Sequence, residues 1–269
     1  MFTTLNAVFI IYVKADAADR DLLCEQFRPI TGVFDQYVGG DINNVVASRR
    51  LIEQFQIIDG PWTRHEPIST CMVTSYLKNK LSSPAYDGVK AFDWVHKDTW
   101  ACNTCNDPVV ESPHLTTSNS MVFFPSTTNE SVKQSMERVY RAGKKKKCDK
   151  CGGEKQNSCN TVTPPMILHL EYVGTDRHGP VYLPPHMERN VDLQGVQYEL
   201  RGATYCDGKH FLFRYYVNDK VFECDDISIG RDAVSVEIEQ PFEVALAGVL
   251  TEEKRHGMMI HEVFYYKMQ

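Results

Sequence analysis

The sequence lacks a long apolar run, an export signal and an excess of positive charge. Its most apolar stretch, NAVFIIYVKADAADR near the start, is too short to span a bilayer, with no basic residue before it and no small-residue cleavage site after it. We therefore expect no membrane association and interpret this stretch as a buried helix. The formal net charge of -6 at pH 7 argues against a protein built mainly to coat nucleic acid, whose phosphates favour a basic surface.

The composition is that of a folded globular protein. Of the 269 residues, 42% are hydrophobic and 24% are charged, which argues against wholesale disorder and fits one large domain or two small ones. No internal repeat is present. Nine cysteines occur without an export signal, and this odd number predicts a reducing, intracellular location, nuclear or cytoplasmic, with free thiols and a metal site in place of disulfides.

The two halves of the sequence differ in pattern. Residues 5 to 81 have apolar positions at three- and four-residue spacings, which predicts helices. From about residue 92 the pattern changes to short runs rich in aromatic and branched residues, which predicts strands: SMVFFP, PMILHLEYV, VQYELRGATYC, HFLFRYYV, KVFECDD and HEVFYYK. Helices followed by strands indicate an α+β fold.

Two CxxC pairs form the first chemical motif. Cys102 and Cys105 make one pair, and Cys148 and Cys151 make the other. A CxxC turn places both sulfurs on one side, and two such turns supply the tetrahedral thiolate shell that Zn²⁺ prefers, so we predict a structural zinc site. Four unrelated thiols are the alternative. A redox CxxC fits less well, because neither pair opens a helix after a strand.

Four consecutive lysines, residues 144 to 147, precede the second pair. Together with Lys150 they would offset the two negative charges of a Zn(Cys)₄ centre. They also fit a nuclear-localisation signal, a patch for an acidic partner or a solvated loop. The spacer between the two pairs, residues 106 to 147, is longer than in a compact zinc ribbon, which predicts that the pairs lie at the tips of two long hairpins.

The segment HFLFRYYVNDKVFECDD is predicted to form a hairpin with Asn218 and Asp219 in its turn. This turn fixes a register in which the following residues are paired: Val217 with Lys220, Tyr216 with Val221, Tyr215 with Phe222, and Arg214 with Glu223. Alternation then puts His210, Leu212 and Arg214 on one face with Glu223 and Asp225. Phe211, Phe213, Tyr215, Phe222 and Cys224 share the opposite face, which we expect to be the core face.

This register makes Asp225 a diagonal neighbour of His210 and turns Asp226 away. A carboxylate so placed orients an imidazole, whose other nitrogen can act as a base toward a nucleophile. The alternative is a surface histidine beside a turn.

Several segments together resemble the ubiquitin-specific protease (USP) family of cysteine isopeptidases, over nearly the whole chain. CNTC, with ES after it, and CDKCGG resemble the zinc-bearing fingers of that family, and NTVTPPMILHLEYV resembles the strand that follows, where Glu171 and Tyr172 depart from the usual basic pattern. YELRGATYCDGKHFLFRYY resembles the histidine box, with Lys209 and Phe211 in place of glycine and tyrosine. VFECDD resembles the aspartate motif, and MIHEVFYYK the closing strand.

The resemblance implies a papain-like USP fold with a helical thumb (residues 1–91), zinc-stapled β fingers (92–165) and an antiparallel β palm (166–269). It assigns His210 and Asp225 as the catalytic pair and ubiquitin or SUMO as the partner. The short fingers and unorthodox boxes are most similar to the divergent SUMO-directed branch.

The nucleophile expected of this family is missing. The cysteine box has the form N-x-C-x-x-N-S, and in MFTTLNAVFIIY the second asparagine corresponds to Asn6, so Thr3 stands at the cysteine position. The asparagine upstream of the cysteine would precede the first residue. Cys24, Cys71 and Cys206 are interpreted as packed thiols.

Three functional hypotheses follow. The first is a USP-fold module that binds ubiquitin or SUMO without cleaving it. The second is an active deubiquitinase or deSUMOylase whose cysteine box lies upstream of a truncated start. The third is a zinc-dependent nucleic-acid-binding protein that uses the lysine run, against which the net charge and the lack of an aromatic-basic strand motif argue. For the sequence as written we favour the first.

Overall fold

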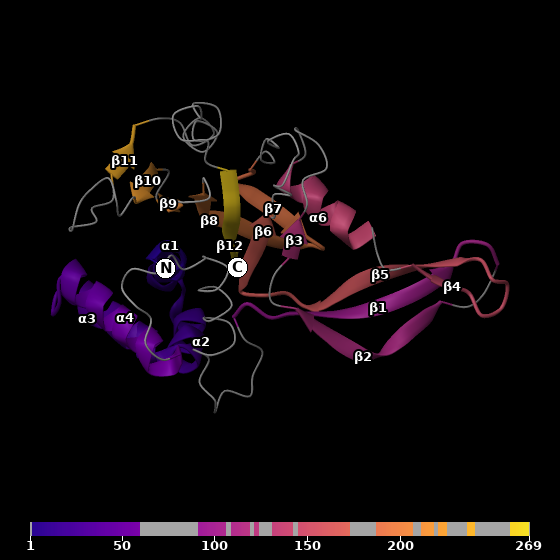
Figure 1. Cartoon of the computed structure of the whole chain (residues 1–269), viewed down its shortest axis with the longest axis horizontal. Helices are drawn as coiled ribbons and strands as arrows, with labels where there is room; N and C mark the ends of the chain where they lie inside the picture. The colour runs from indigo at the N-terminus through magenta and orange to yellow at the C-terminus, as the bar shows by residue number, and fades with distance from the viewer. Residues whose placement is uncertain are drawn as a thin grey trace. The chain divides into compact units, whose positions relative to one another are not determined.

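A computed structural model describes most of the chain (Figure 1). The described residues are 2–59, 91–105, 109–118, 121–123, 131–141, 145–172, 187–206, 211–217, 220–224, 236–239 and 259–268. The chain divides into two compact units: residues 1–91 with 201–264, and residues 92–200 with 265–269. No helix within the described residues is long and apolar enough to cross a membrane.

The first unit begins with the helices α1 (Phe2–Lys14), α2 (Ala17–Gln26), α3 (Arg28–Val38) and α4 (Asn44–Asp59). Local signals set their starts: the Asp16 carboxylate accepts the N–H of Asp19 at 2.8 Å, and a proline occupies the first turn of α3. α3 packs against both α2 and α4. The helical prediction for residues 5–81 is confirmed for residues 5–59, and residues 60–81 lie outside the described part.

The core of these helices contains the apolar run near the start of the sequence. Ala7, Val8, Ile11 and Tyr12 of α1 are buried, as predicted for that run. They are joined in the core by other fully buried apolar side chains from α2, α3 and the residue between them: Leu23, Phe27 and Ile30. Burial of such side chains contributes roughly 1.5 to 3 kcal/mol each to the free energy of folding.

The larger sheet follows the order β11-β10-β9-β8-β12-β6-β3, and β7 pairs with β8. The strands that belong wholly or partly to the first unit are β8 (Val196–Cys206), β9 (Phe211–Val217), β10 (Lys220–Cys224), β11 (Val236–Ile238) and β12 (Met259–Lys267). Within this unit α1 packs against β9. The predicted strands in VQYELRGATYC, HFLFRYYV, KVFECDD and HEVFYYK are therefore confirmed.

The β9–β10 hairpin corrects one expectation about the core. Phe213 and Cys224 on the predicted core face are buried, but Tyr215 and Phe222 on that face are only half-buried. On the opposite face, Leu212, Tyr216 and Val221 are buried as well. Both faces of the hairpin are covered because the sheet contributes to packing on both sides, so alternation alone did not identify a single core face.

The second unit contains a four-stranded antiparallel sheet of order β2-β1-β5-β4. Its strands are β1 (Trp94–Cys102), β2 (Val110–Ser118), β4 (Lys145–Lys147) and β5 (Glu154–Thr163). The first and last pairs of strands are hairpins, and β1 and β5 join them along the middle of the sheet (Figure 1). The lysine run, which the sequence left open as a loop, contributes β4.

The rest of the second unit includes α6 (Val132–Arg141), β3 (Met121–Phe123), β6 (Ile167–Tyr172) and β7 (Asn190–Leu193). Strands β3 and β6 confirm the predictions for SMVFFP and PMILHLEYV, and they pair in parallel. Helix α6 was not predicted. Its start is a capping box, in which Ser131 Oγ accepts the N–H of Gln134 and Gln134 Oε1 accepts the N–H of Ser131.

Candidate functional site

The four paired cysteines lie at the tips of the two hairpins of the four-stranded sheet. Cys102 ends β1, and Cys105 follows in the connection to β2. Cys148 and Cys151 lie in the turn between β4 and β5. That turn is closed by the N–H of Gly152 donating to Cys148 O at 2.8 Å and the N–H of Cys148 donating to Gly153 O at 2.7 Å. The predicted position of the cysteines, at two hairpin tips, is confirmed.

The sulfur geometry fits a tetrahedral metal ion. The four Sγ atoms all lie within 4.8 Å of one another. The separation is 3.6 Å between Cys102 and Cys151 and 3.9 Å between Cys105 and Cys148. A tetrahedral shell with Zn–S bonds of about 2.3 Å requires sulfurs about 3.8 Å apart. The residues present therefore fit Zn²⁺ in both donor type and spacing.

The backbone around the cluster favours thiolates. The N–H of Thr104 donates to Cys102 Sγ at 3.4 Å, and this bond, followed by one from the Cys105 N–H, lowers the pKa of Cys102 to about 6. The N–H of Gly153 donates to Cys151 Sγ at 3.4 Å and lowers the pKa of that thiol, but desolvation and the side-chain hydrogen bonds with Cys102 and Cys148 outweigh this bond, so the pKa of Cys151 is raised overall. Cys148 is buried and Cys151 is exposed, so the cluster is covered on one side only.

Close packing joins the two CxxC turns. A Cβ added at Gly153 would lie 2.7 Å from the Cβ of Thr104 and 3.1 Å from the Sγ of Cys151. Gly152, the preceding residue, has φ of +71° and open space around the Cβ position. The double glycine thus has two separate roles, because one glycine permits a left-handed backbone and the other permits contact between the turns. Sequence reasoning did not identify the contact with Thr104.

The lysines near the cluster have mixed roles. Lys146 Nζ lies 4.3 Å from the ring centroid of Trp100, a cation–π contact on one face of the sheet. Lys147 and Lys150 are exposed, and Lys147 is paired in register with Glu154 across the hairpin. Two acidic residues, Asp149 and Glu154, lie among them in sequence, so the charge around the tip is not uniformly positive.

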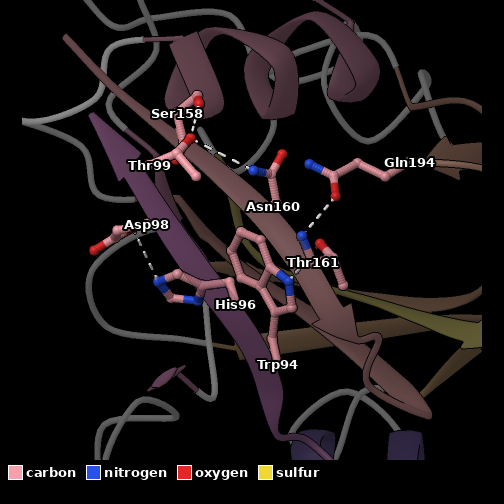
Figure 2. Close-up of polar contacts among 8 residues, drawn as sticks. All are labelled: Trp94, His96, Asp98, Thr99, Ser158, Asn160, Thr161 and Gln194. Carbon is pink, nitrogen blue, oxygen red and sulfur yellow. Dashed lines mark hydrogen bonds and ion pairs between the residues drawn. The ribbon is translucent and has the colours of Figure 1, made fainter. Parts of the chain in front are cut away.

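A row of polar side chains crosses the base of the same sheet (Figure 2). On β1, His96 Nε2 faces the Asp98 carboxylate at 3.9 Å, and Trp94 Nε1 donates to Thr161 Oγ1 at 2.8 Å. On the other face, the hydroxyls of Thr99 and Ser158 are hydrogen-bonded, and Asn160 Nδ2 donates to Thr99 Oγ1 at 3.5 Å. Thr161 N–H donates to Gln194 Oε1 at 2.8 Å.

Strand β5 alternates between a solvent face and a covered face. Glu154, Gln156, Ser158 and Asn160 are exposed, whereas Lys155 and Asn157 between them are buried. Sequence reasoning missed this surface, because EKQNSCNTVT is polar on both faces and lacks the alternation of apolar residues that marks a strand.

The register predicted for the β9–β10 hairpin is confirmed in all four pairs. Arg214 Nε and Nη2 donate to Glu223 Oε2 at 2.9 and 2.7 Å. His210, Asp225 and Asp226 lie outside the described residues, immediately before β9 and after β10. Their assignment as a catalytic pair with an aspartate turned away therefore stays a prediction.

The positions considered for a nucleophile are distributed as follows. Thr3 lies in the first turn of α1, where the structure describes its backbone and not its side chain. Cys24 lies inside α2, as predicted, with its Sγ 3.6 Å from the hydroxyl of Tyr12. Cys206 ends β8, and Cys71 lies outside the described residues.

Comparisons with known proteins find similar structures but no similar sequence. No family model and no curated protein matches the sequence. The structure is similar to chains in the SAGA DUB module of Ubp8, Sgf11, Sus1 and Sgf73 bound to monoubiquitin, with a TM-score of 0.61, 12% identity, and coverage of 90% of this chain and 59% of that chain. For the module bound to ubiquitin aldehyde the TM-score is 0.61 and the identity 11%, with coverage of 90% of this chain and 60% of that chain. For a further structure of the Ubp8-Sgf11-Sgf73-Sus1 module the TM-score is 0.61 and the identity 12%, with coverage of 100% of this chain and 65% of that chain.

These values establish that the chain has a USP-like α+β fold. The chain spans about three fifths of the length of the first matched chains, which are covered to 59% and 60%.

Proposed function

We propose that this chain is a USP-like domain that binds ubiquitin or a ubiquitin-like modifier and does not hydrolyse it as written. The observation that carries the proposal is the likeness in fold over at least 90% of the chain to the SAGA DUB modules, two of which are described as bound to monoubiquitin and to ubiquitin aldehyde. Fold likeness suits a binding claim better than a catalytic one, because binding uses surface shape and catalysis needs particular side chains.

In this proposal Cys102, Cys105, Cys148 and Cys151 hold one structural zinc ion. Four thiolates would fill the coordination shell of the ion and leave no position for a substrate, so the ion would make the hairpin tips rigid and take no part in catalysis. The sulfur separations of 3.6 and 3.9 Å support this assignment. The four-stranded sheet then belongs to the fingers (residues 92–165) of a fold that also has a thumb (residues 1–91) and a palm (residues 166–269).

The surface proposed to contact the modifier includes the solvent face of β5. Gln156, Ser158 and Asn160 present exposed polar side chains on one face of a sheet whose tips the metal would fix. Ser158 and Asn160 are already hydrogen-bonded to Thr99, so these two side chains lose little entropy when a folded globule binds.

The proposed lack of hydrolysis follows from Thr3. The family cysteine sits at the start of the first helix, and Thr3 occupies the first turn of α1. A threonine hydroxyl remains protonated at neutral pH and is a weaker nucleophile than a thiolate. Packing of α1 against β9, the strand that follows His210 in sequence, supports placing Thr3 on the side of the proposed histidine.

An active isopeptidase is the second candidate. The Arg214–Glu223 register favours it, since that register agrees with the predicted one in which Asp225 is a diagonal neighbour of His210, and a site without function need not retain both residues. An in-frame N-x-C sequence upstream of the Met1 codon would supply the missing nucleophile.

The test is a side-by-side pull-down with ubiquitin and SUMO, together with an electrophilic carboxy-terminal probe of each. We expect weak binding of one modifier, reduced at least tenfold by Gln156→Arg and unchanged by Glu25→Arg, an exposed position on α2. We expect no covalent labelling. Binding of neither modifier would refute the proposal, and labelling that disappears in His210→Ala would favour the active enzyme.

A further inference from the structure

Lys155, a charged residue of β5, is buried beside the cysteine cluster. Only 5% of its surface is exposed, although residues 154 and 156 on either side of it are exposed. Lysine is almost never buried to this degree without a compensating charge, because an ammonium group loses its hydration when it leaves water. The position of Lys155 therefore calls for a negative charge close to it.

The register of the four-stranded sheet places Lys155 next to one of the cluster cysteines. Lys155 is opposite Cys102 on β1, and the pairing continues beyond it, since the N–H of Asn103 donates to Glu154 O at 3.2 Å. Residues directly opposite in antiparallel strands project their side chains from the same face, with Cβ atoms about 4.5 to 5.5 Å apart. A lysine side chain is long enough to bring its ammonium group near a sulfur from that separation.

On its other side Lys155 is opposite a second lysine. Lys146 of β4 is paired with it in register, and like charges directly opposite each other destabilise a sheet. Lys146 is exposed, and its Nζ lies 4.3 Å from the ring centroid of Trp100. Solvent and an aromatic ring thus accommodate the charge of Lys146, whereas the charge of Lys155 is withdrawn from solvent.

We propose that Lys155 supplies the main positive charge that stabilises the Zn(Cys)₄ centre, in place of the exposed lysines around the second CxxC pair. Four thiolates and Zn²⁺ carry two net negative charges, and a desolvated ammonium group interacts with them more strongly than one in water. Lys147 and Lys150 are exposed, so solvent and salt screen their charges. The assignment rests on the zinc site of the proposed function.

Lys155 acts on the affinity for the metal and is not itself a ligand, because a protonated amine has no lone pair to donate. Lys155→Met retains an apolar side chain of similar length but removes the charge, and it should weaken zinc binding by about 10- to 100-fold. Lys155→Arg retains the charge and should recover most of the affinity. A role in packing alone predicts the reverse order, with methionine tolerated better than the bulkier arginine.

The experiment measures zinc affinity in the full chain by competition with a chromophoric chelator, at about 0.1 and 1 M salt. Lys150→Met is the matched control, because Lys150 lies between two cluster cysteines in sequence but is exposed. Its effect should be small and should disappear at 1 M salt, where the screening length is about 3 Å. The loss in Lys155→Met should persist at both salt concentrations.

Two further measurements keep the outcome readable. The backbone amide spectrum verifies the fold of each variant, and the absorption of the cobalt-loaded protein verifies tetrahedral thiolate coordination. If Lys155→Met fails to fold, Lys155→Gln, which is also uncharged, takes its place and should show the same loss.

The possible results separate the role of Lys155 from the zinc site. If the wild type binds one zinc ion and Lys155→Met binds it as tightly, the role of Lys155 is refuted and the site stands. Equal losses in Lys155→Met and Lys155→Arg would also overturn the role, since geometry and not charge would then control the affinity. A wild type that binds no zinc refutes both. Modifier binding does not enter, because the titrations contain no ubiquitin or SUMO.

Discussion

Gly153→Ala tests whether contact between the two CxxC turns controls the metal site. The added methyl carbon would lie 2.7 Å from Thr104 Cβ and 3.1 Å from Cys151 Sγ, where ordinary van der Waals contacts are 3.4 to 4 Å. Thr104 cannot relieve the overlap by rotating its side chain, because its Cβ is fixed by the backbone. One turn must therefore move away from the other.

The expected magnitude combines two effects. Overpacking of this kind destabilises a protein by about 1 to 3 kcal/mol. Displacement of Cys151, which lies 3.6 Å from Cys102, would also disturb the sulfur tetrahedron. Changes that disturb the surroundings of a metal site typically weaken metal binding by about 10- to 100-fold, and we expect a loss in this range.

Two assays measure these effects: zinc competition with a chromophoric chelator, and thermal unfolding with and without that chelator. Gly152→Ala is the matched control, because its Cβ would meet open space and only the left-handed backbone resists it, at a cost of about 1 kcal/mol. Thr104→Gly/Gly153→Ala removes the overlapping Cβ and should recover most of the zinc affinity. Wild-type zinc affinity and melting temperature in Gly153→Ala would refute the reasoning.

Four other predictions follow from the described packing. Cys148→Ser should reduce bound zinc from one equivalent per chain to none and lower the melting temperature, because a structural site's binding energy is also folding energy. Cys24→Ser should retain the metal. Elemental analysis of protein purified without chelator measures the zinc content of both variants. Gly202→Ala should destabilise the chain by about 1 to 3 kcal/mol in urea unfolding, since its Cβ would lie 2.5 Å from the ring of Phe213, whereas Gly32→Ala in α3, with open space, should stabilise by about 0.5 to 1 kcal/mol; equal effects would contradict the packing argument. Burial raises the pKa of Tyr198 and of Tyr205 above the unfolded value of 10.0, so stability should be fully present below pH 10 and decline as the pH rises above it, with phenol ionisation at 295 nm accompanying unfolding. Tyr198→Phe, which loses a 2.8 Å bond to Pro165 O, should cost about 1 kcal/mol at neutral pH, whereas Tyr205→Phe should cost less, because the Tyr205 hydroxyl has no hydrogen-bond partner among the described residues.

Local patterns in the sequence determined several features correctly. The spacing of apolar residues predicted the helices over residues 5–59, because one face of each helix must be apolar to pack. The register of the β9–β10 hairpin followed from turn length and from the opposite charges of Arg214 and Glu223. The two CxxC pairs predicted that four sulfurs meet, since few other arrangements of paired thiols give a stable site.

Only the tertiary structure decided the features that depend on what covers a surface. Strand β5 is mostly polar, so no alternation of apolar residues revealed it, and it forms by pairing with β1 and β4. Burial of Tyr216 and Val221 as well as Phe213 shows that both faces of one hairpin are covered, which alternation within that hairpin does not encode. The contact of Gly153 with Thr104 joins residues far apart in sequence. Such contacts depend on how separate elements pack, whereas local sequence specifies only periodicity, turns and short-range charge.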